Sequence, residues 1–127
     1  MGGGKGKSMT WSAVVHVVLV QAHGLTAMDA GMSSDPYCKL SLGKEKFKSK
    51  TKSETINPKW REAFDFNWYE EFDTELEVAV FDKDVGSKDD FMGRYYILWL
   101  DAILTFKYFS TNQSSKLLHC YASFRLG

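Results

Sequence analysis

The sequence predicts an all-β domain, a β-sandwich built from short strands. In several segments apolar and polar residues alternate at the two-residue period of a β-strand. Other segments are continuous runs of β-branched and aliphatic residues, and turn-forming residues separate the segments at short intervals. Because no segment shows a helical period longer than one or two turns, two packed sheets are the expected architecture.

The N-terminal half of the chain contains four expected strands. The run A-V-V-H-V-V-L-V is apolar on both faces and rich in valine, which predicts a central strand. A later segment alternates, with Phe64, Phe66 and Trp68 on one face. The predicted strands are residues 13–20, 37–42, 46–51 and 62–68. They are separated by a loop over 21–35, a turn at Gly43 and an interruption of the strand pattern at Asn57-Pro58.

The C-terminal half contains four more. Leu76, Val78 and Val80 alternate with other residues and are expected to point inward. Beyond Leu100 the strand pattern weakens, although two further strands on either side of a polar turn are still predicted. The predicted strands of this half are residues 75–81, 92–98, 104–109 and 116–126.

Length and composition indicate one folded domain without net charge. The chain has 127 residues, of which 44% are hydrophobic and 15% aromatic, and this argues against disorder. Sixteen basic and sixteen acidic side chains cancel, so a general nucleic-acid-binding protein is not expected. No run reaches the roughly 20 apolar residues of a membrane-spanning helix. We predict a flexible lead-in or linker over residues 1–10, the domain over 11–127, and reduced thiols at Cys38 and Cys120.

Five aspartates fall in two loops that follow predicted strands. Asp29 and Asp35 lie in M-D-A-G-M-S-S-D-P-Y, and Asp82, Asp84 and Asp90 lie in F-D-K-D-V-G-S-K-D-D-F. Ca²⁺ takes roughly six to eight oxygen ligands from flexible carboxylates and carbonyls. Since five carboxylates at one end of a β-domain would repel one another without a cation, we predict that they bind calcium. The alternative is a set of solvated aspartates in ordinary turns.

Five lysines alternate with other residues after the second predicted strand. At the strand period their ammonium groups project from one face, spaced about 6–7 Å apart. Such like charges suggest a polyanionic partner, and a lysine near an anionic leaflet contributes on the order of 1 kcal/mol. The alternative is a strand face whose lysines favour solubility and prevent aggregation. The five are Lys44, Lys46, Lys48, Lys50 and Lys52.

Three motifs, in this order, resemble those of C2 domains. They are G-M-S-S-D-P-Y-C-K-L at 31–40, N-P-K-W-R-E-A-F-D-F at 57–66 and F-D-K-D-x5-D-F-M-G-R at 81–94. The resemblance covers roughly residues 11–94, and within the family it is greatest to the multiple C2 and transmembrane-domain proteins. It implies an eight-stranded antiparallel sandwich, with the first strand before calcium loop 1 and the last strand at the C-terminus.

The resemblance also implies a ligand set for calcium. The family's five acidic ligands, two in the first calcium loop and three in the third, fall on the five aspartates, and none is substituted. Backbone carbonyls of Met28 and Lys83 would complete the coordination of two or three Ca²⁺. Lysine-rich strands at the corresponding place in the family commonly contact phosphoinositides. Met32 and Val85 lie near the expected loop tips, where they would insert into a membrane interface or be incidental loop residues.

The resemblance ends after Gly93-Arg94. Residues 95–109 are a dense apolar run, where the family usually has a polar connection after its alternating strand. The first strand would keep an unpaired apolar edge unless the last strand pairs beside it. We therefore expect residues 116–126 to supply that strand imperfectly, and residues 95–115 to be the least stable part of the divergent region 95–127.

No motif indicates catalysis. G-G-G-K-G-K-S lacks the first glycine and the preceding strand of a phosphate-binding loop, and the third-loop spacing does not fit an EF-hand. His16 is predicted to be a core histidine, and no nucleophile is patterned near His23 or His119.

The predicted function is therefore non-enzymatic: Ca²⁺-dependent docking to anionic phospholipids such as phosphatidylserine and phosphoinositides, in the service of membrane trafficking or calcium signalling. The expected location is peripheral, on the cytoplasmic face of membranes, and transmembrane segments outside this chain would anchor the parent protein. The alternatives are a protein-interaction domain with a structural calcium site, or the targeting fragment of a larger membrane-associated enzyme.

Overall fold

The chain forms an all-β structure, as predicted. The computed structural model describes residues 13–25, 34–68, 75–98, 105–109 and 117–126, so the predicted lead-in lies outside the described residues. Within them no helix has the length and apolar composition needed to cross a bilayer. The strands are β1 (Ala13–His23), β2 (Pro36–Leu42), β3 (Glu45–Lys48), β4 (Lys59–Trp68), β5 (Glu75–Asp82), β6 (Asp90–Leu98), β7 (Thr105–Phe109) and β8 (Leu117–Leu126).

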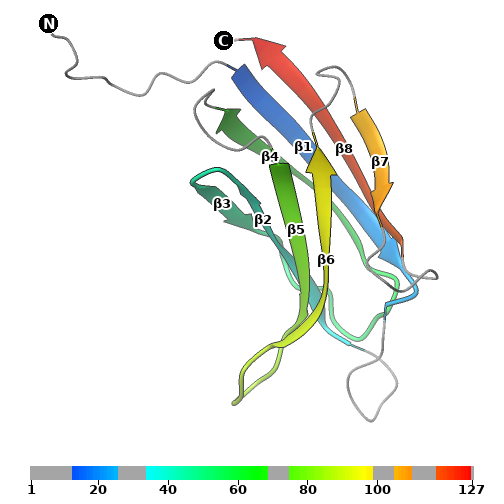
Figure 1. Ribbon diagram of the computed structural model, residues 1–127. Helices are drawn as coiled ribbons and strands as arrows, with labels where there is room; N and C mark the ends of the chain where they lie inside the picture. The colour runs from blue at the N-terminus through cyan, green and yellow to red at the C-terminus, as the bar shows by residue number, and fades with distance from the viewer. Residues whose placement is uncertain (1–12, 26–33, 69–74, 99–104, 110–116, 127) are drawn as a thin grey trace, which may run out of the picture.

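The eight strands make two four-stranded antiparallel sheets (Figure 1). One sheet has the order β4-β1-β8-β7 and is called the β1 sheet below; the other has the order β3-β2-β5-β6 and is called the β2 sheet. β1 is central because β4 and β8 flank it, as its apolar sequence predicted. The antiparallel sandwich, with its first strand before the first loop and its last strand at the C-terminus, is confirmed.

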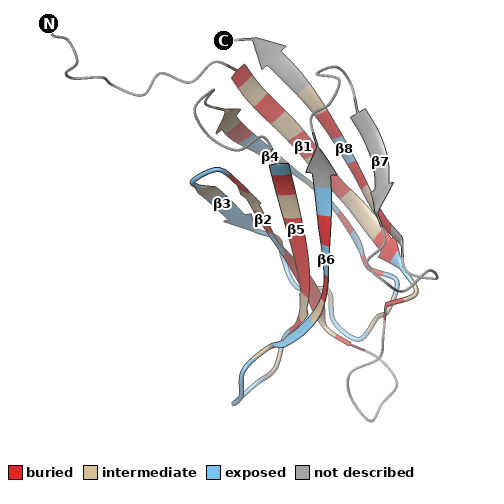
Figure 2. Ribbon diagram, viewed as in Figure 1, coloured by how far each residue is buried: buried red, intermediate tan, exposed pale blue. Residues whose placement is uncertain are grey.

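The core lies between the two sheets, and alternate residues of β1 are buried in it (Figure 2). Val15, Val17 and Leu19 of β1 are fully buried, as are the inward-facing residues of β5 that alternation predicted. Aromatic side chains add to this mainly aliphatic core, and Phe66 and Trp60 of β4 belong to the same cluster. Burying such large apolar surfaces is the main favourable term in folding.

The last strand closes the β1 sheet. β8 pairs with β1 from Ala13 opposite Leu126 to His23 opposite Leu117, with one register shift between Leu19 and Gln21. The prediction that this segment supplies the strand beside the first is therefore confirmed, and its pairing is continuous apart from that bulge. β8 protects one edge of β1 and β4 protects the other, so the apolar first strand presents no open edge.

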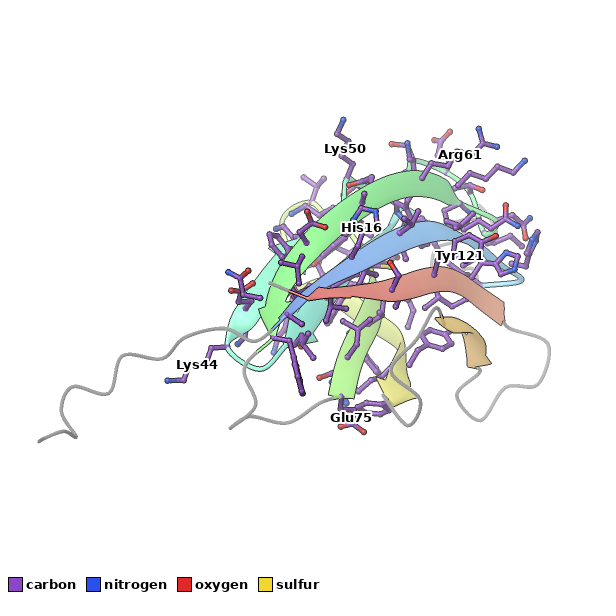
Figure 3. All side chains as sticks on the ribbon, turned by 90° about the horizontal axis from the view of Figure 1, so that it is seen from above. His16, Lys44, Lys50, Arg61, Glu75 and Tyr121 are labelled. Atoms are coloured by element: carbon purple, nitrogen blue, oxygen red, sulfur yellow. The ribbon has the colours of Figure 1, made fainter. Side chains whose placement is uncertain are left out.

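His16 is not a core histidine, contrary to the prediction. Its side chain is 43% exposed on the outer side of β1, where Nδ1 lies 2.6 Å from Oδ1 of Asp65 on β4 (Figure 3). The two residues are direct partners in the β1–β4 register. The apolar run predicted burial on both faces, but no layer of the described structure packs over the outer face of the β1 sheet, so only alternate residues of β1 are buried.

Both cysteines are free and buried, in agreement with the prediction of reduced thiols. Cys38 of β2 and Cys120 of β8 belong to the core cluster. Burial raises the pKa of Cys120 to about 12 and the pKa of Cys38 well above its usual range. The thiols therefore stay protonated at neutral pH and pack as small apolar groups.

The two described segments between residues 95 and 115 both belong to edge strands. β7 pairs with β8 alone, and β6 pairs with β5 alone. Edge strands have fewer neighbours that must open before an amide meets water. We expect amide hydrogens of β7 to exchange faster than those of the central strand β5 in a native-state exchange experiment. Equal protection of the two strands would contradict the predicted instability of this region.

Candidate calcium site

Three aspartates meet where β5 ends and β6 begins. Asp82 is the last residue of β5, Asp90 is the first of β6, and the two are direct partners in the register. Asp84 lies two residues beyond Asp82, and carboxylate oxygens of all three residues lie within 4.8 Å of one another. Like charges directly opposite each other destabilise a strand pair. Only 2% of Asp82 is exposed, so a cation would relieve a substantial repulsion here.

Asp35 is held beside this cluster by backbone hydrogen bonds. Its N–H donates to Oδ1 of Asp82 at 2.8 Å, and its carbonyl accepts from the N–H of Lys83 at 3.0 Å. The N–H of Glu54 donates to Oδ1 of Asp35 at 2.6 Å. These contacts follow from the β2–β5 pairing, in which Pro36 is opposite Asp82. Three of the five predicted ligands thus have their carboxylates together, and the backbone of a fourth, Asp35, is hydrogen-bonded beside them across the β2–β5 pairing.

Asp84 lies among other negative charges. Loss of solvent and the charges of Asp90 and Asp89 raise the pKa of the Asp84 carboxyl above its ordinary value. A raised carboxyl pKa means that the surroundings of Asp84 disfavour its ionised form. A bound divalent cation would reverse this effect, because it stabilises the carboxylate.

Asp89 belongs to the same loop but has a different role, which sequence reasoning missed. Its Oδ1 accepts from the N–H of Asp84 at 2.9 Å, and its Oδ2 accepts from the hydroxyl of Tyr37. The Asp84 hydrogen bond, followed by that of Tyr37, lowers the pKa of Asp89. Burial and the bond to Asp89 raise the pKa of Tyr37 to about 12, so the phenol remains a donor. Asp89 therefore ties the loop to β2, and the doubled D-D in the sequence was the available signal.

The tip of the same loop is exposed. Val85 is 99% exposed, and Gly86 beside it has φ 86°, a left-handed conformation that favours glycine. The loop projects from the lower end of the β2 sheet in Figure 1. The end of the sandwich that carries Asp35, Asp82, Asp84 and Asp90 is called the acidic pole below. The other residues predicted for it, Met28, Asp29 and Met32, lie outside the described residues.

The predicted single row of five lysines along one strand is wrong. β3 ends at Lys48, because buried Ser49 turns its hydroxyl to accept from the N–H of Cys38 at 2.8 Å. Lys46 and Lys48 share a face of β3, whereas the other three lie outside the strand. Figure 3 shows Lys44 and Lys50 pointing in different directions. The three lysines outside the strand are Lys44, Lys50 and Lys52.

The outer face of the β2 sheet assembles a different basic surface, here called the basic groove. It has a volume of about 400 Å³, within the range of small-ligand sites. Lys48, Lys39, Ala79 and Arg94 occur in one row, each opposite the next across the four strands. Sequence reasoning missed two of these cations. A lysine inside an otherwise apolar strand was the signal for Lys39. The cations of the groove are Lys39, Lys46, Lys48 and Arg94.

A cluster of aromatic rings connects the basic groove with the strand ends next to the β5–β6 loop. Tyr37 stacks on Phe81 with ring centroids 5.7 Å apart, and Phe91 meets Phe81 edge-on at 5.7 Å. Cations lie over these rings: Lys39 is 4.7 Å from the centroid of Phe81, and Lys48 is 5.4 Å from that of Tyr37. Such contacts hold the ammonium groups over the sheet rather than free in solvent.

The comparison with known families agrees with this antiparallel sandwich. Residues 13–117 match the C2 domain family. The chain belongs to this family, as its motifs indicated.

Individual relatives are similar over most of this chain. Multiple C2 and transmembrane domain-containing protein 1 of Homo sapiens is 47% identical over 88 residues, which is 69% of this chain and 9% of that protein. The chain thus spans about a tenth of the length of this relative.

Solved structures of other proteins share the fold. A calcium-bound structure of two C2 domains of extended synaptotagmin 2 superposes with a TM-score of 0.83 at 27% identity, covering 92% of this chain and 47% of that one. Human GIVD cytosolic phospholipase A2 gives 0.81 at 26% identity, covering 94% of this chain and 17% of that one.

Proposed function

We propose that this domain is a non-enzymatic module that docks on anionic phospholipid membranes when Ca²⁺ binds its acidic pole. The observation that carries the proposal is the meeting of Asp82, Asp84 and Asp90 within 4.8 Å, with Asp35 hydrogen-bonded beside them. Oxygen-rich, partly exposed carboxylates suit Ca²⁺. Further support is that a structural relative, extended synaptotagmin 2, is described as calcium bound.

Electrostatics supplies the switch. Without calcium the acidic pole repels an anionic lipid surface. Two bound Ca²⁺ would add about four positive charges, and their open coordination positions would accept a lipid carboxylate or phosphate. Asp29, with the carbonyls of Met28 and Lys83, would complete the coordination of two or three ions. Repulsion then becomes attraction with little conformational change.

Two other surfaces would take part in docking. Val85 at the loop tip, together with Met32, would enter the membrane interface once calcium has neutralised the pole. The basic groove would bind phosphoinositide headgroups independently of calcium, chiefly through Lys46 and Lys48, which share the exposed face of β3. The module would act peripherally at the cytoplasmic face of membranes, within a larger parent protein that serves trafficking or calcium signalling.

Liposome co-sedimentation tests the docking proposal. We expect sedimentation with phosphatidylserine vesicles in Ca²⁺, none in chelator, and little with neutral vesicles in either condition. Loss of the apolar side chain at the loop tip, Val85→Ser, should weaken the calcium-dependent binding and leave calcium uptake unchanged. Equal sedimentation with and without Ca²⁺ on phosphatidylserine alone would contradict the switch. A lipid-free pull-down that is indifferent to Ca²⁺ would favour a protein-interaction domain with a structural calcium site.

A further inference from the structure

A second group of side chains with metal-binding chemistry lies on the β1 sheet, the opposite sheet from Asp82, Asp84 and Asp90. Gln21 and His23 lie at the end of β1, and His119 lies near the start of β8. Gln21 and His119 are direct partners in the β1–β8 register, and His23 follows two residues after Gln21. Residues two apart in a strand share a face, so the three side chains are neighbours.

A bulge in β1 brings them to the outer face. The register of β1 with both β4 and β8 shifts between Leu19 and Gln21. Up to Leu19 the odd-numbered residues of β1 point into the core, whereas beyond the shift Ala22 is buried and His23 is exposed. An extra residue in one strand re-aims every later side chain. Without it, Gln21 and His23 would point into the apolar core.

The two imidazoles turn toward a single point. Nε2 of Gln21 lies 3.0 Å from Nε2 of His23 and 3.4 Å from Nδ1 of His119. An amide nitrogen can only donate hydrogen bonds, so both imidazole nitrogens accept and direct their lone pairs at it. Metal–imidazole bonds are about 2.0–2.1 Å long. If the amide moves aside, the ring of His23 needs to advance by about 1 Å and that of His119 by about 1.4 Å to bind one ion there.

We propose that His23 and His119 chelate a divalent transition-metal ion of the Zn²⁺ class at the position of the Gln21 amide nitrogen. Imidazole nitrogen suits Zn²⁺, Cu²⁺ and Ni²⁺, whereas Ca²⁺ prefers oxygen, so this site and the acidic pole select different ions. Water would fill the remaining coordination positions. Lys59, the partner of Gln21 on β4, is exposed, and its long side chain keeps the ammonium in water.

An ion in this place would join the first and last strands of the β1 sheet. The two histidines are far apart in sequence and come together only when β8 pairs with β1. The metal would therefore bind the folded state and stabilise closure of the sheet by the C-terminal strand. The site is independent of the proposed membrane docking, because none of its residues belongs to the acidic pole or the basic groove.

Zinc titration calorimetry tests this proposal in an Asp82→Asn/Asp84→Asn background, so that the acidic pole does not compete for the metal. We expect one Zn²⁺ site that excess Ca²⁺ does not displace. His23→Gln or His119→Gln should weaken binding by at least about tenfold, the loss that even an outer-shell partner commonly causes. His16→Gln is the matched control, since His16 lies on the same sheet and is hydrogen-bonded to Asp65 instead. The zinc affinity of this variant should be unchanged.

The imidazole NMR signals give a second readout. The chain contains three histidines, so Zn²⁺ should shift or broaden the ring signals of His23 and His119 and leave those of His16 in place. Melting temperatures in chelator show whether each variant is folded. Zinc binding that persists in the His23→Gln/His119→Gln double variant, or that perturbs His16 equally, would overturn the proposal and indicate adventitious binding.

Discussion

Calcium is expected to raise the melting temperature of this domain by on the order of 10 °C when Ca²⁺ exceeds its dissociation constant a hundredfold. Binding to the folded state alone stabilises it by about 2.7 kcal/mol at that excess, and about 1 kcal/mol shifts the melting temperature by several degrees in a domain of this size. The physical source is the directly opposed Asp82 and Asp90 with Asp84 beside them, whose repulsion the ion removes. Differential scanning calorimetry in millimolar Ca²⁺ and in chelator measures the shift.

The double substitution Asp82→Asn with Asp84→Asn should abolish the calcium-dependent shift. Asparagine keeps an oxygen that can accept the hydrogen bond from the N–H of Asp35, so the loop geometry is retained while the charge is lost. Asp65→Asn is the control, because this aspartate lies on the β1 sheet and contacts His16. It should leave the calcium shift intact. If Ca²⁺ leaves the melting temperature of the unsubstituted domain unchanged, the calcium site is refuted.

Removal of the two groove lysines of β3 should weaken calcium-independent binding to phosphoinositide membranes by about thirtyfold. Each lysine near an anionic surface contributes roughly 1 kcal/mol, so Lys46→Ala with Lys48→Ala loses about 2 kcal/mol, and each 1.4 kcal/mol is tenfold. Lys48 is held over the ring of Tyr37, close to Lys39 in the same row. Liposome binding in chelator at low salt is the measurement, and calcium uptake should not change.

Two lysines outside β3 provide the matched control for this experiment. Lys50→Ala with Lys52→Ala removes the same charge from the loop after β3, where neither residue lines the basic groove. Under the proposal this variant binds phosphoinositide vesicles nearly as well as the unsubstituted domain. If the two double variants lose equal affinity, net charge decides the binding rather than the groove. If neither loses affinity, the lysines serve solubility alone.

Much of the fold was predictable because β-strands have a local signature. The period of two and the valine-rich runs were sufficient to place all eight strands to within a few residues, including β8. Loop chemistry was similarly local. Asp82, Asp84 and Asp90 lie in one short segment whose composition already indicated calcium, and the structure brings their oxygens within 4.8 Å.

Features that depend on pairing between distant strands were decided only by the tertiary structure. The predicted lysine row failed because β3 ends at Lys48, where Ser49 is drawn inward by the N–H of Cys38 on the neighbouring strand. The basic groove takes Lys39 and Arg94 from other strands, through register that no local pattern encodes.

The two histidine results have the same cause. A valine-rich run around His16 has the same composition whether one face or both faces of its strand are covered, and only the packed sandwich leaves the outer face open. The bulge after Leu19 likewise exists only relative to the partners of β1, yet it decides which side of the sheet His23 occupies. The sequence by itself determined the strands, their order along the chain and the acidic loop. The tertiary structure alone decided which side chains from separate strands share a surface, because that depends on register and on which faces another layer covers.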